Sequence, residues 1–393
     1  MSFHHAIQAV VVAVDVGKNT LALSATDSEH QILLDPFDAA MTRTGLNAAL
    51  EKIQVVIPPD IPVLVGIEAA GHYHRPLSSP MSWPPGWKLL QLNPAHVAEQ
   101  RRIQGRRKVK TAAIDLEAIT ELVLAGRGQQ MTERSVVIGS ITVLAAHRYR
   151  RIEAKTALKN QILGQLDRTF PGLSLALPNI LATKVGRLVT EHFADPDRLS
   201  SLGTERFIRY AQVRGLQVRG PMAARLVAAA RDALPQTDAV SARDVLVEDL
   251  AMLQLLDGQI CTVDAQLAAL LPSTPFHPLL SVPGWSVSRA AAYGAGIGEP
   301  SRWPGQSQIY RASGLSPSQY ESAGRRRDGS ISREGSVELR RALIGLGNGL
   351  WLHDPASKDY VEARTRRSTP GRASFQSSSE SGTHARQLRS PRL

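Results

Sequence analysis

Carboxylates stand at three places in the first third of the chain where together they could hold a metal ion. One apolar run ends at Asp15, a second ends at Glu68, and a helix predicted to begin near Thr111 carries Asp115. Carboxylates at strand ends and on a facing helix can converge on one point. Oxygen ligands at such a point suit a hard cation such as Mg²⁺. The sequence therefore predicts a magnesium-dependent reaction in this part of the chain.

The elements that must position these acids follow from the hydrophobic pattern. The residues at 8–15 are apolar and mostly β-branched, which favours a central strand. Further strands are expected at 20–26, 31–34, 63–67 and 87–92, with helices at 44–56, from Gly71 onward and after Asn93-Pro94. The expected order is three strands, helix, strand, helix, strand and helix, with acids at the ends of the first and fourth strands. This is the order of a ribonuclease-H-like α/β fold. We assign it to residues 8–130.

Each acid also has a simpler interpretation. Asp15 could end a strand at a turn, Glu68 could cap the next helix, and Asp115 could be an acid that the helix dipole favours. The stretch from Asp15 to Thr20 would also suit the phosphate loop of an actin-like ATPase. That fold needs a second glycine-rich phosphate loop late in the chain, and we find no convincing one.

Composition narrows the class of protein. The 393 residues carry 46 basic and 35 acidic side chains, a formal net charge of +11, which favours a polyanionic partner such as nucleic acid. Cys261 is the single cysteine, which excludes a disulfide framework or a zinc cluster within one chain. The N-terminus lacks the pattern of a secretory signal, and no run approaches the roughly 18 apolar residues of a membrane span. We expect a cytoplasmic, nucleoid-associated protein without membrane contact.

Basic residues crowd just before the helix of Asp115, interleaved with Gln104 and Gly105 as in a loop. They are Arg101, Arg102, Arg106, Arg107, Lys108 and Lys110. Such a cluster next to a metal site would grip the phosphates of a nucleic-acid strand. The sequence supports equally well a basic loop that is only solvated and does not bind nucleic acid.

The middle of the chain, 131–272, is predicted to be helical. Two long amphipathic helices are expected at about 141–166 and 244–271, and the second has a heptad-like apolar seam. The two helices could pair as an antiparallel hairpin, form a coiled coil with a partner chain, or present an ordinary core face. Smaller helices are expected at 202–216 and 221–234. We assign this region to oligomerisation and to contacts with RNA and DNA.

The last part of the chain contains two further motifs. The turn at Val282-Pro283-Gly284 is similar to that of a helix-hairpin-helix element, whose backbone N–H groups can meet phosphates. Downstream come Gly314-Leu-Ser-Pro317, Ser322 followed by Gly324, and a predicted helix between Gly335 and Leu343.

Taken with Asp15, the Gly66-Ile-Glu68 segment, Asn93-Pro94 and the Lys110 to Asp115 stretch, these motifs resemble one family over nearly the whole chain up to His353. It is the IS-one-ten class of insertion-sequence transposases, which are guided by a bridge RNA. The resemblance implies a RuvC-like DEDD domain, a helical coiled-coil middle, and a mostly helical transposase domain at 273–362 that carries a catalytic serine. The fold class is thus α/β plus all-α.

The resemblance also implies a reaction. Ser322 would attack a scissile phosphate and leave a phosphoserine link to DNA, while Mg²⁺ at Asp15, Glu68 and Asp115 neutralises charge. Arg325, Arg326 and Arg327 would steady phosphate oxygens, unless they form a flexible solvated run. The site would combine two subunits of a homodimer that assembles into a tetramer. A noncoding bridge RNA would pair with donor and target DNA, so the protein itself would read little sequence.

One position departs from the family's pattern. The family has two acids three residues apart, where they share a helical face, but Ala112 stands at the first of them. Glu117 lies on another face and cannot substitute. We therefore expect weakened metal binding and little or no strand cleavage, either because the substitution was engineered or because this is a decayed natural copy. A junction-resolving nuclease without serine chemistry and a catalytically silent nucleic-acid-binding protein remain as alternatives. The tail at 363–393, rich in Arg and Ser, is expected to be disordered.

Overall fold

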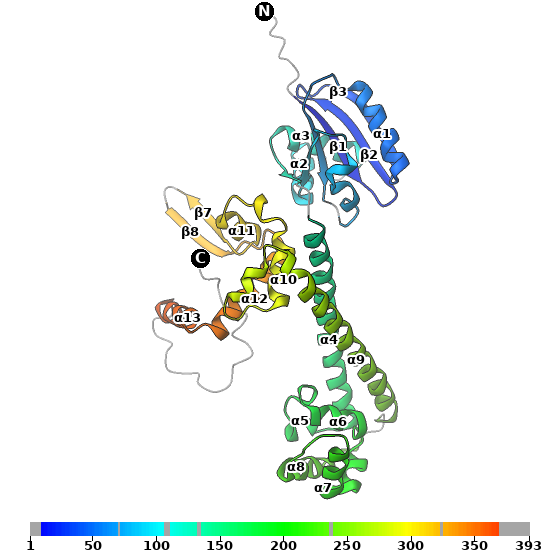
Figure 1. Ribbon diagram of the computed structural model, residues 1–393, viewed down its shortest axis with the longest axis vertical. Helices are drawn as coiled ribbons and strands as arrows, with labels where there is room; N and C mark the ends of the chain where they lie inside the picture. The colour runs from blue at the N-terminus through cyan, green and yellow to red at the C-terminus, as the bar shows by residue number, and fades with distance from the viewer. Residues whose placement is uncertain are drawn as a thin grey trace, which may run out of the picture. The chain divides into compact units, whose positions relative to one another are not determined.

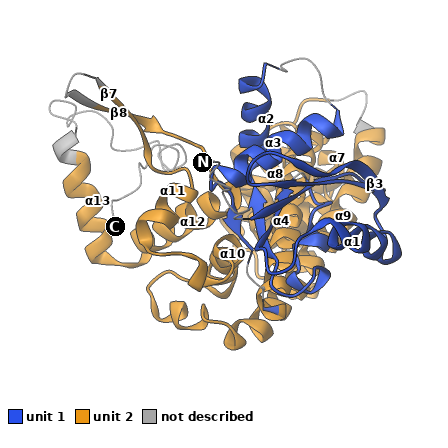
Figure 2. Cartoon of the chain, turned by 90° about the horizontal axis from the view of Figure 1, so that it is seen from above, with its two compact units in different colours: residues 1–135 blue, residues 136–393 orange. Residues whose placement is uncertain are grey.

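The computed structural model describes residues 9–69, 71–105, 111–131, 135–235, 239–322 and 325–368 (Figure 1). The chain forms two compact units, residues 1–135 and 136–393, which Figure 2 colours separately. The first unit holds the predicted acids and the second holds Ser322, so each unit is described by itself.

The first unit is built on a mixed sheet in the order β3-β2-β1-β4-β5-β6. Its strands are β1 (Val10–Val16), β2 (Thr20–Asp27), β3 (Ile32–Ala40), β4 (Val63–Glu68), β5 (Lys88–Leu92) and β6 (Gln129–Gln130). The strands β1 to β3 form an antiparallel meander, whereas β4 and β5 run parallel to β1. This is the ribonuclease-H-like arrangement that the sequence predicted.

Helices cover both faces of this sheet (Figure 1). They are α1 (Arg43–Val56), α2 (Pro94–Ile103) and α3 (Ala112–Leu124). Because side chains alternate along a strand, Val10, Val12 and Val14 pack in the cluster with α1. The intervening Val11 and Ala13 pack in a second cluster with α3. The alternation decides which face each strand-end acid occupies.

Two predictions about this unit need correction. The segment after Gly71 does not form an α-helix; it makes turns and two short 3₁₀ helices, Arg75–Ser78 and Pro80–Ser82. Pro76 and Pro80 lack the N–H groups that an α-helix would use, which explains the interruption. β3 continues past Leu34 to Ala40 despite Pro36, because β3 lies at the edge of the sheet, where proline is tolerated.

The second unit contains two long helices, α4 (Val136–Thr169) and α9 (Ala239–Leu270), which pack against each other. Arg148 of α4 pairs with Asp264 of α9 at 2.5 Å, and Lys155 pairs with Asp257. The residue numbers of the partners on α9 fall as those on α4 rise, so the two helices run antiparallel. The antiparallel hairpin is therefore the alternative that the structure bears out within one chain.

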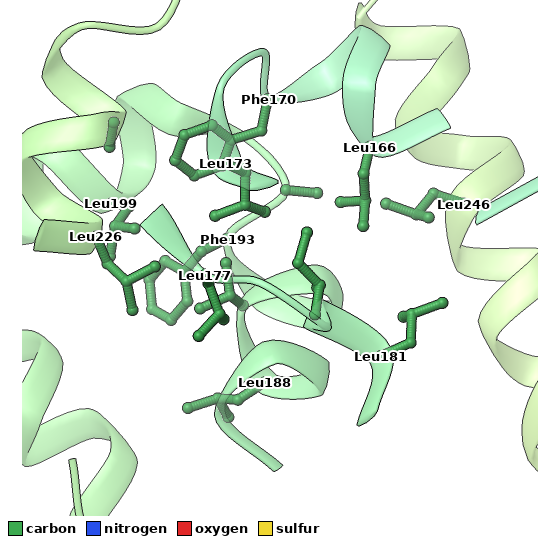
Figure 3. Packing of buried hydrophobic residues seen from close by; sticks show 14 of the residues in the cluster. Leu166, Phe170, Leu173, Leu177, Leu181, Leu188, Phe193, Leu199, Leu226 and Leu246 are labelled. Carbon is green, nitrogen blue, oxygen red and sulfur yellow. The ribbon is translucent and has the colours of Figure 1, made fainter. Parts of the chain in front are cut away.

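A small helical bundle lies between these helices in the sequence. It contains α5 (Leu173–Ala176), a 3₁₀ turn (Ile180–Ala182), α6 (Lys184–His192), α7 (Pro196–Val213) and α8 (Gly220–Arg231). Figure 3 shows its core, where Phe170, Phe193 and leucines from several helices meet. The rings of Phe193 and Phe207 pack edge to face. The same core includes Leu166 of α4 and Leu246 of α9, so the bundle packs against the α4–α9 hairpin.

The C-terminal part of the second unit packs on the α4–α9 hairpin through Ile138, Ile141, Val263 and Leu267. Its elements are 3₁₀ turns at Leu271–Ser273, His277–Ser281 and Pro300–Arg302, helices α10 (Val287–Ile297), α11 (Gln306–Ala312), α12 (Val337–His353) and α13 (Pro355–Ser368), and strands β7 (Pro317–Ser322) and β8 (Arg325–Ile331). The expectation of disorder from 363 is wrong as far as Ser368, because α13 continues there; residues 369–393 lie outside the described part. In the described part, no helix combines the length and apolar character needed to cross a membrane.

Candidate functional site

Asp15 and Glu68 stand side by side at the ends of neighbouring parallel strands. The register pairs Val14 of β1 with Ile67 of β4, so the two acids occupy the next rung. Asp15 alternates with Ala13, and Glu68 alternates with Gly66. Both therefore lie on the face of the sheet that α3 covers. Both are half-buried.

Asp115 approaches the same face from the first turns of α3. Thr111 caps this helix, its Oγ1 accepting a hydrogen bond from the Ile114 N–H at 3.4 Å. Gly66 lets the helix lie close on β4: a Cβ there would meet the Ile119 and Val123 side chains at 2.8 and 2.7 Å. This explains the glycine two residues before Glu68. Strand ends and helix start thus bring three carboxylates to one edge of one face.

The carboxylate of Asp115 is only 2% exposed and forms an ion pair with Arg101 of α2, with Nη1 3.0 Å from Oδ1. No pattern in the sequence predicts this pair, because it depends on how α2 packs against α3. Within the described residues, no three His, Cys, Asp or Glu side chains are grouped closely enough to hold a metal ion. The oxygen donors suit a hard cation in their chemistry, but the described residues do not bring three of them within reach of one ion.

Ala112 is exposed at the first position of α3, one turn before Asp115. Glu117 is exposed while Asp115 is buried, which confirms that Glu117 lies on another face of the helix. The edge of the sheet therefore lacks a fourth carboxylate at the position where three-residue spacing would put one.

The predicted basic loop is partly helical. Arg101 and Arg102 belong to the last turn of α2 rather than to a loop. Arg102 is exposed and pairs with Glu99 at 2.9 Å. The remaining basic residues, Arg106, Arg107, Lys108 and Lys110, lie outside the described residues.

Ser322 is the last residue of β7 and pairs in register with Arg325, the first residue of β8. The next rung pairs Glu321 with Arg326, and the one after that pairs Tyr320 with Arg327. Tyr320 is 68% exposed and Arg327 is exposed.

The base of this hairpin is held by a close backbone approach. Gly335 has φ +145°, and a Cβ there would lie 2.2 Å from the Ala312 carbonyl oxygen. The Arg333 N–H donates to the Gly314 carbonyl at 3.0 Å, and both terminal nitrogens of Arg340 donate to the Arg333 carbonyl at 3.2 Å. Sequence reasoning noted Gly314 and Gly335 only as motif residues. They close the base of the hairpin near Pro317 and Ile331, whereas Ser322 lies at the opposite end, beside the turn.

The Val282-Pro283-Gly284 turn packs against α12. Gly284 has φ +78°, and a Cβ there would lie 2.2 Å from the Gly349 carbonyl oxygen. The Arg289 guanidinium donates to the Gly284 carbonyl at 2.5 Å. A packing requirement thus accounts for this glycine, while the predicted phosphate contact of the turn stays a prediction.

Comparison with protein families gives two matches. Residues 12–171 match a family described as a transposase, with the DEDD domain of the IS110 type. Residues 277–362 match the transposase IS116/IS110/IS902 family. Among curated proteins, none is similar enough to count as a match. The first segment contains all three acids and the second contains Ser322.

Proposed function

Because the chain belongs to the IS110 (IS-one-ten) family of insertion-sequence transposases, which act on DNA, we propose that it exchanges DNA strands through a covalent link to Ser322. The observation that carries this proposal is the pairing of two sites in one chain. Three carboxylates share one face and edge of the first unit's sheet, and the serine ends a strand of a braced hairpin in the second unit.

In the proposed step, the Ser322 hydroxyl oxygen bonds to the scissile phosphorus, and the bond from phosphorus to the 3′-oxygen of the neighbouring nucleotide breaks. The proton lost by the serine is balanced by the proton that the leaving 3′-oxygen takes up. The product is a 5′-phosphoserine link and a free 3′-hydroxyl. Rejoining is the reverse attack by another 3′-hydroxyl, so the energy of the phosphodiester is kept in the link.

Asp15, Glu68 and Asp115 would hold Mg²⁺, which when bound supplies positive charge to the phosphate and to the leaving oxygen. On the hairpin, Arg327 offers a charge-assisted donor near Ser322, and the register gives Arg325 a rung beside it. We assign phosphate contacts at the serine to Arg325, Arg326 and Arg327.

The acids and the serine belong to different compact units. We further propose that the chain forms a homodimer, and that dimers pair into a tetramer, in which the first unit of one chain and the second unit of another complete a site. A noncoding bridge RNA would select donor and target by base pairing. Such a division of labour fits a basic chain, since phosphate contacts carry affinity without reading sequence.

This chain is proposed to be impaired, because Ala112 leaves the acidic edge one carboxylate short. The test is therefore run on the Ala112→Asp protein with end-labelled donor DNA and with RNA transcribed from the flanking noncoding DNA. We expect a DNA–protein adduct that survives denaturation and is absent when Ser322 is also changed to Ala. Strand cleavage that persists without Ser322 would favour a junction-resolving nuclease. Binding without cleavage in both proteins would favour a silent nucleic-acid-binding protein.

A further inference from the structure

Charge is distributed unevenly over the helices of the second unit. Helix α4 carries six basic and two acidic side chains, and α9 carries one basic and five acidic ones, so the two helices together have no net charge. Ion pairs such as those of Arg148 with Asp264 and Lys155 with Asp257 join them. The bundle of α5 to α8, residues 173–231, carries nine basic and four acidic side chains, a net charge of +5. The excess positive charge therefore lies on the bundle.

The basic side chains of the bundle are accessible to a ligand. All nine are exposed, and eight of them are arginines, whose planar guanidinium suits phosphate oxygens. Of the six arginines on α7, on α8 and between them, only Arg209 has an acidic partner among the described residues. That partner is Glu205 at 4.0 Å, and both side chains are at least 74% exposed, so the pair is weak. The six are Arg206, Arg209, Arg214, Arg219, Arg225 and Arg231.

Helix α7 turns arginines away from the core of the bundle. Phe207 is buried in that core, whereas Arg206 and Arg209, three residues apart, share an exposed face of the helix. Arg214 follows at the end of α7, with its guanidinium 3.6 Å from the centroid of the Tyr210 ring and Nη1 donating to the Tyr210 carbonyl at 3.3 Å. These contacts hold the guanidinium in place without neutralising its charge.

The aromatic rings of the bundle decide what kind of nucleic acid this surface suits. Phe193 and Phe207 lie in the core, and Tyr210 is half-buried with Arg214 over its ring. Surfaces that hold single strands use exposed rings on which bases stack. The backbone of a duplex needs only positive charge and N–H donors. The bundle therefore suits the phosphates of a duplex, whatever its sequence.

Helix α4 sets the distance between the bundle and the part of the chain that carries Ser322. Ile141 packs in the cluster of that C-terminal part, and Ile162 packs in the core of the bundle. The helix between these two residues spans about 30 Å at the usual rise per residue. One turn of a duplex is about 34 Å long. Along α4, the bundle is thus about one duplex turn from the C-terminal part.

We propose that the exposed arginines of α7 and α8 form a binding surface for the phosphate backbone of a DNA or RNA duplex, about one duplex turn from the part that carries Ser322. This inference rests on the proposed function, which makes nucleic acid the polyanion that the bundle meets. Its measurement needs no strand cleavage. Duplex binding without a covalent adduct would therefore count against the serine chemistry alone.

The experiment measures binding of the full-length protein to DNA and RNA duplexes of about three turns, by fluorescence anisotropy over a series of KCl concentrations. The test protein combines Arg206→Gln with Arg209→Gln. Each lost phosphate contact should reduce the slope of log K against log salt by about 0.9 on DNA, and the two together should weaken binding by about tenfold or more. Tighter binding to one of the two duplexes would identify which nucleic acid the surface holds.

Two matched proteins separate position from charge. Arg150→Gln combined with Lys159→Gln removes the same charge from α4 and should leave the Kd and the salt slope unchanged. Arg206→Lys combined with Arg209→Lys keeps the charge and should keep the slope of the parent protein.

A second measurement uses the parent protein without any substitution. Labelling of arginine with phenylglyoxal, read by mass spectrometry, should fall at Arg206 and Arg209 when a duplex saturates the protein, and should stay constant at Arg150. The proposed surface is overturned by an unchanged Kd and slope in the folded double glutamine variant, by an equal loss in the α4 control, or by labelling that the duplex does not reduce.

Discussion

At the scale of single residues, the proposed chemistry depends on the first turns of α3. Thr111 caps the helix, Ala112 is exposed at its first position, and Asp115 is buried against Arg101. Positions 112 and 115 share one helical face, so a carboxylate at 112 would point in the same general direction as Asp115. Position 113 is equally exposed but turned about 100° away around the helix.

The first prediction uses this pair of neighbouring alanines. Ala112→Asp should raise the yield of covalent DNA adduct by about 100-fold or more, since even outer-shell changes at metal sites alter activity by that order. Ala113→Asp adds the same charge to the same turn and should give no gain. Both should leave folding intact or improve it by about 0.3–1 kcal/mol, because acids suit a helix N-terminus. Equal activity in the two proteins would show that charge, and not position 112, is what matters.

At the scale of elements, the hairpin of β7 and β8 needs its glycine-closed base. Gly335→Ala would drive a Cβ into the Ala312 carbonyl, and φ +145° is itself strained for alanine. We expect loss of the covalent adduct in the Ala112→Asp background while Mn²⁺ binding by the first unit is kept.

The control for that substitution is Gly347→Ala in α12, where a Cβ would meet nothing within 4 Å. It should stabilise the protein by about 0.5–1 kcal/mol, as expected for replacing a glycine inside a helix. Adduct formation that survives Gly335→Ala would mean that the base of the hairpin does not position Ser322.

A second element-scale prediction concerns the start of α13. Hydrogen bonds from the Ser357 hydroxyl and N–H hold the pKa of the Asp354 carboxyl below its ordinary value. The pKa of this carboxyl is thus lower in the folded protein than in the unfolded protein, where it is near 4. The ionised carboxylate therefore stabilises the helix at pH values above 4, and this stabilisation is lost as the pH falls through the pKa of the folded protein.

NMR measurement of the first-turn amides should therefore show α13 fraying from its start in strongly acidic solution. Asp354→Asn caps without titrating, so it should remove this acid dependence. The same acid-induced fraying in the asparagine variant would assign the effect to some other group.

The elements also show what a sequence can predict. The apolar β-branched run before Asp15 and the heptad-like seam of α9 define a strand and a helix locally, and both were placed nearly correctly. In place of the short helix expected from Gly71 onward, the chain forms turns and two short 3₁₀ helices, each with a proline in its first turn. The Arg101–Asp115 pair and the Gly335 contact join segments that only the folded chain brings together. Neither had a periodic signal that would have revealed it.

At the scale of the whole molecule, the proposal requires a site that two chains complete. Mixing two inactive proteins tests this, both in the Ala112→Asp background: Ser322→Ala, which keeps the acids, and Asp115→Asn, which keeps the serine. If acids and serine act across chains, mixed assemblies contain complete sites and the adduct should reappear. Each protein alone should remain inactive, and an inactive mixture of proteins that do assemble together would place acids and serine in the same chain.

The most direct test of the proposed serine chemistry is the identity of the residue that becomes linked to DNA. The Ala112→Asp protein is reacted with donor DNA and RNA, digested with nuclease and protease, and the peptides are sequenced by mass spectrometry. We predict a nucleotide attached through its 5′-phosphate to Ser322 and a free 3′-hydroxyl on the other DNA fragment. A nucleotide on any other residue, or cleaved DNA with no peptide attached, would contradict it.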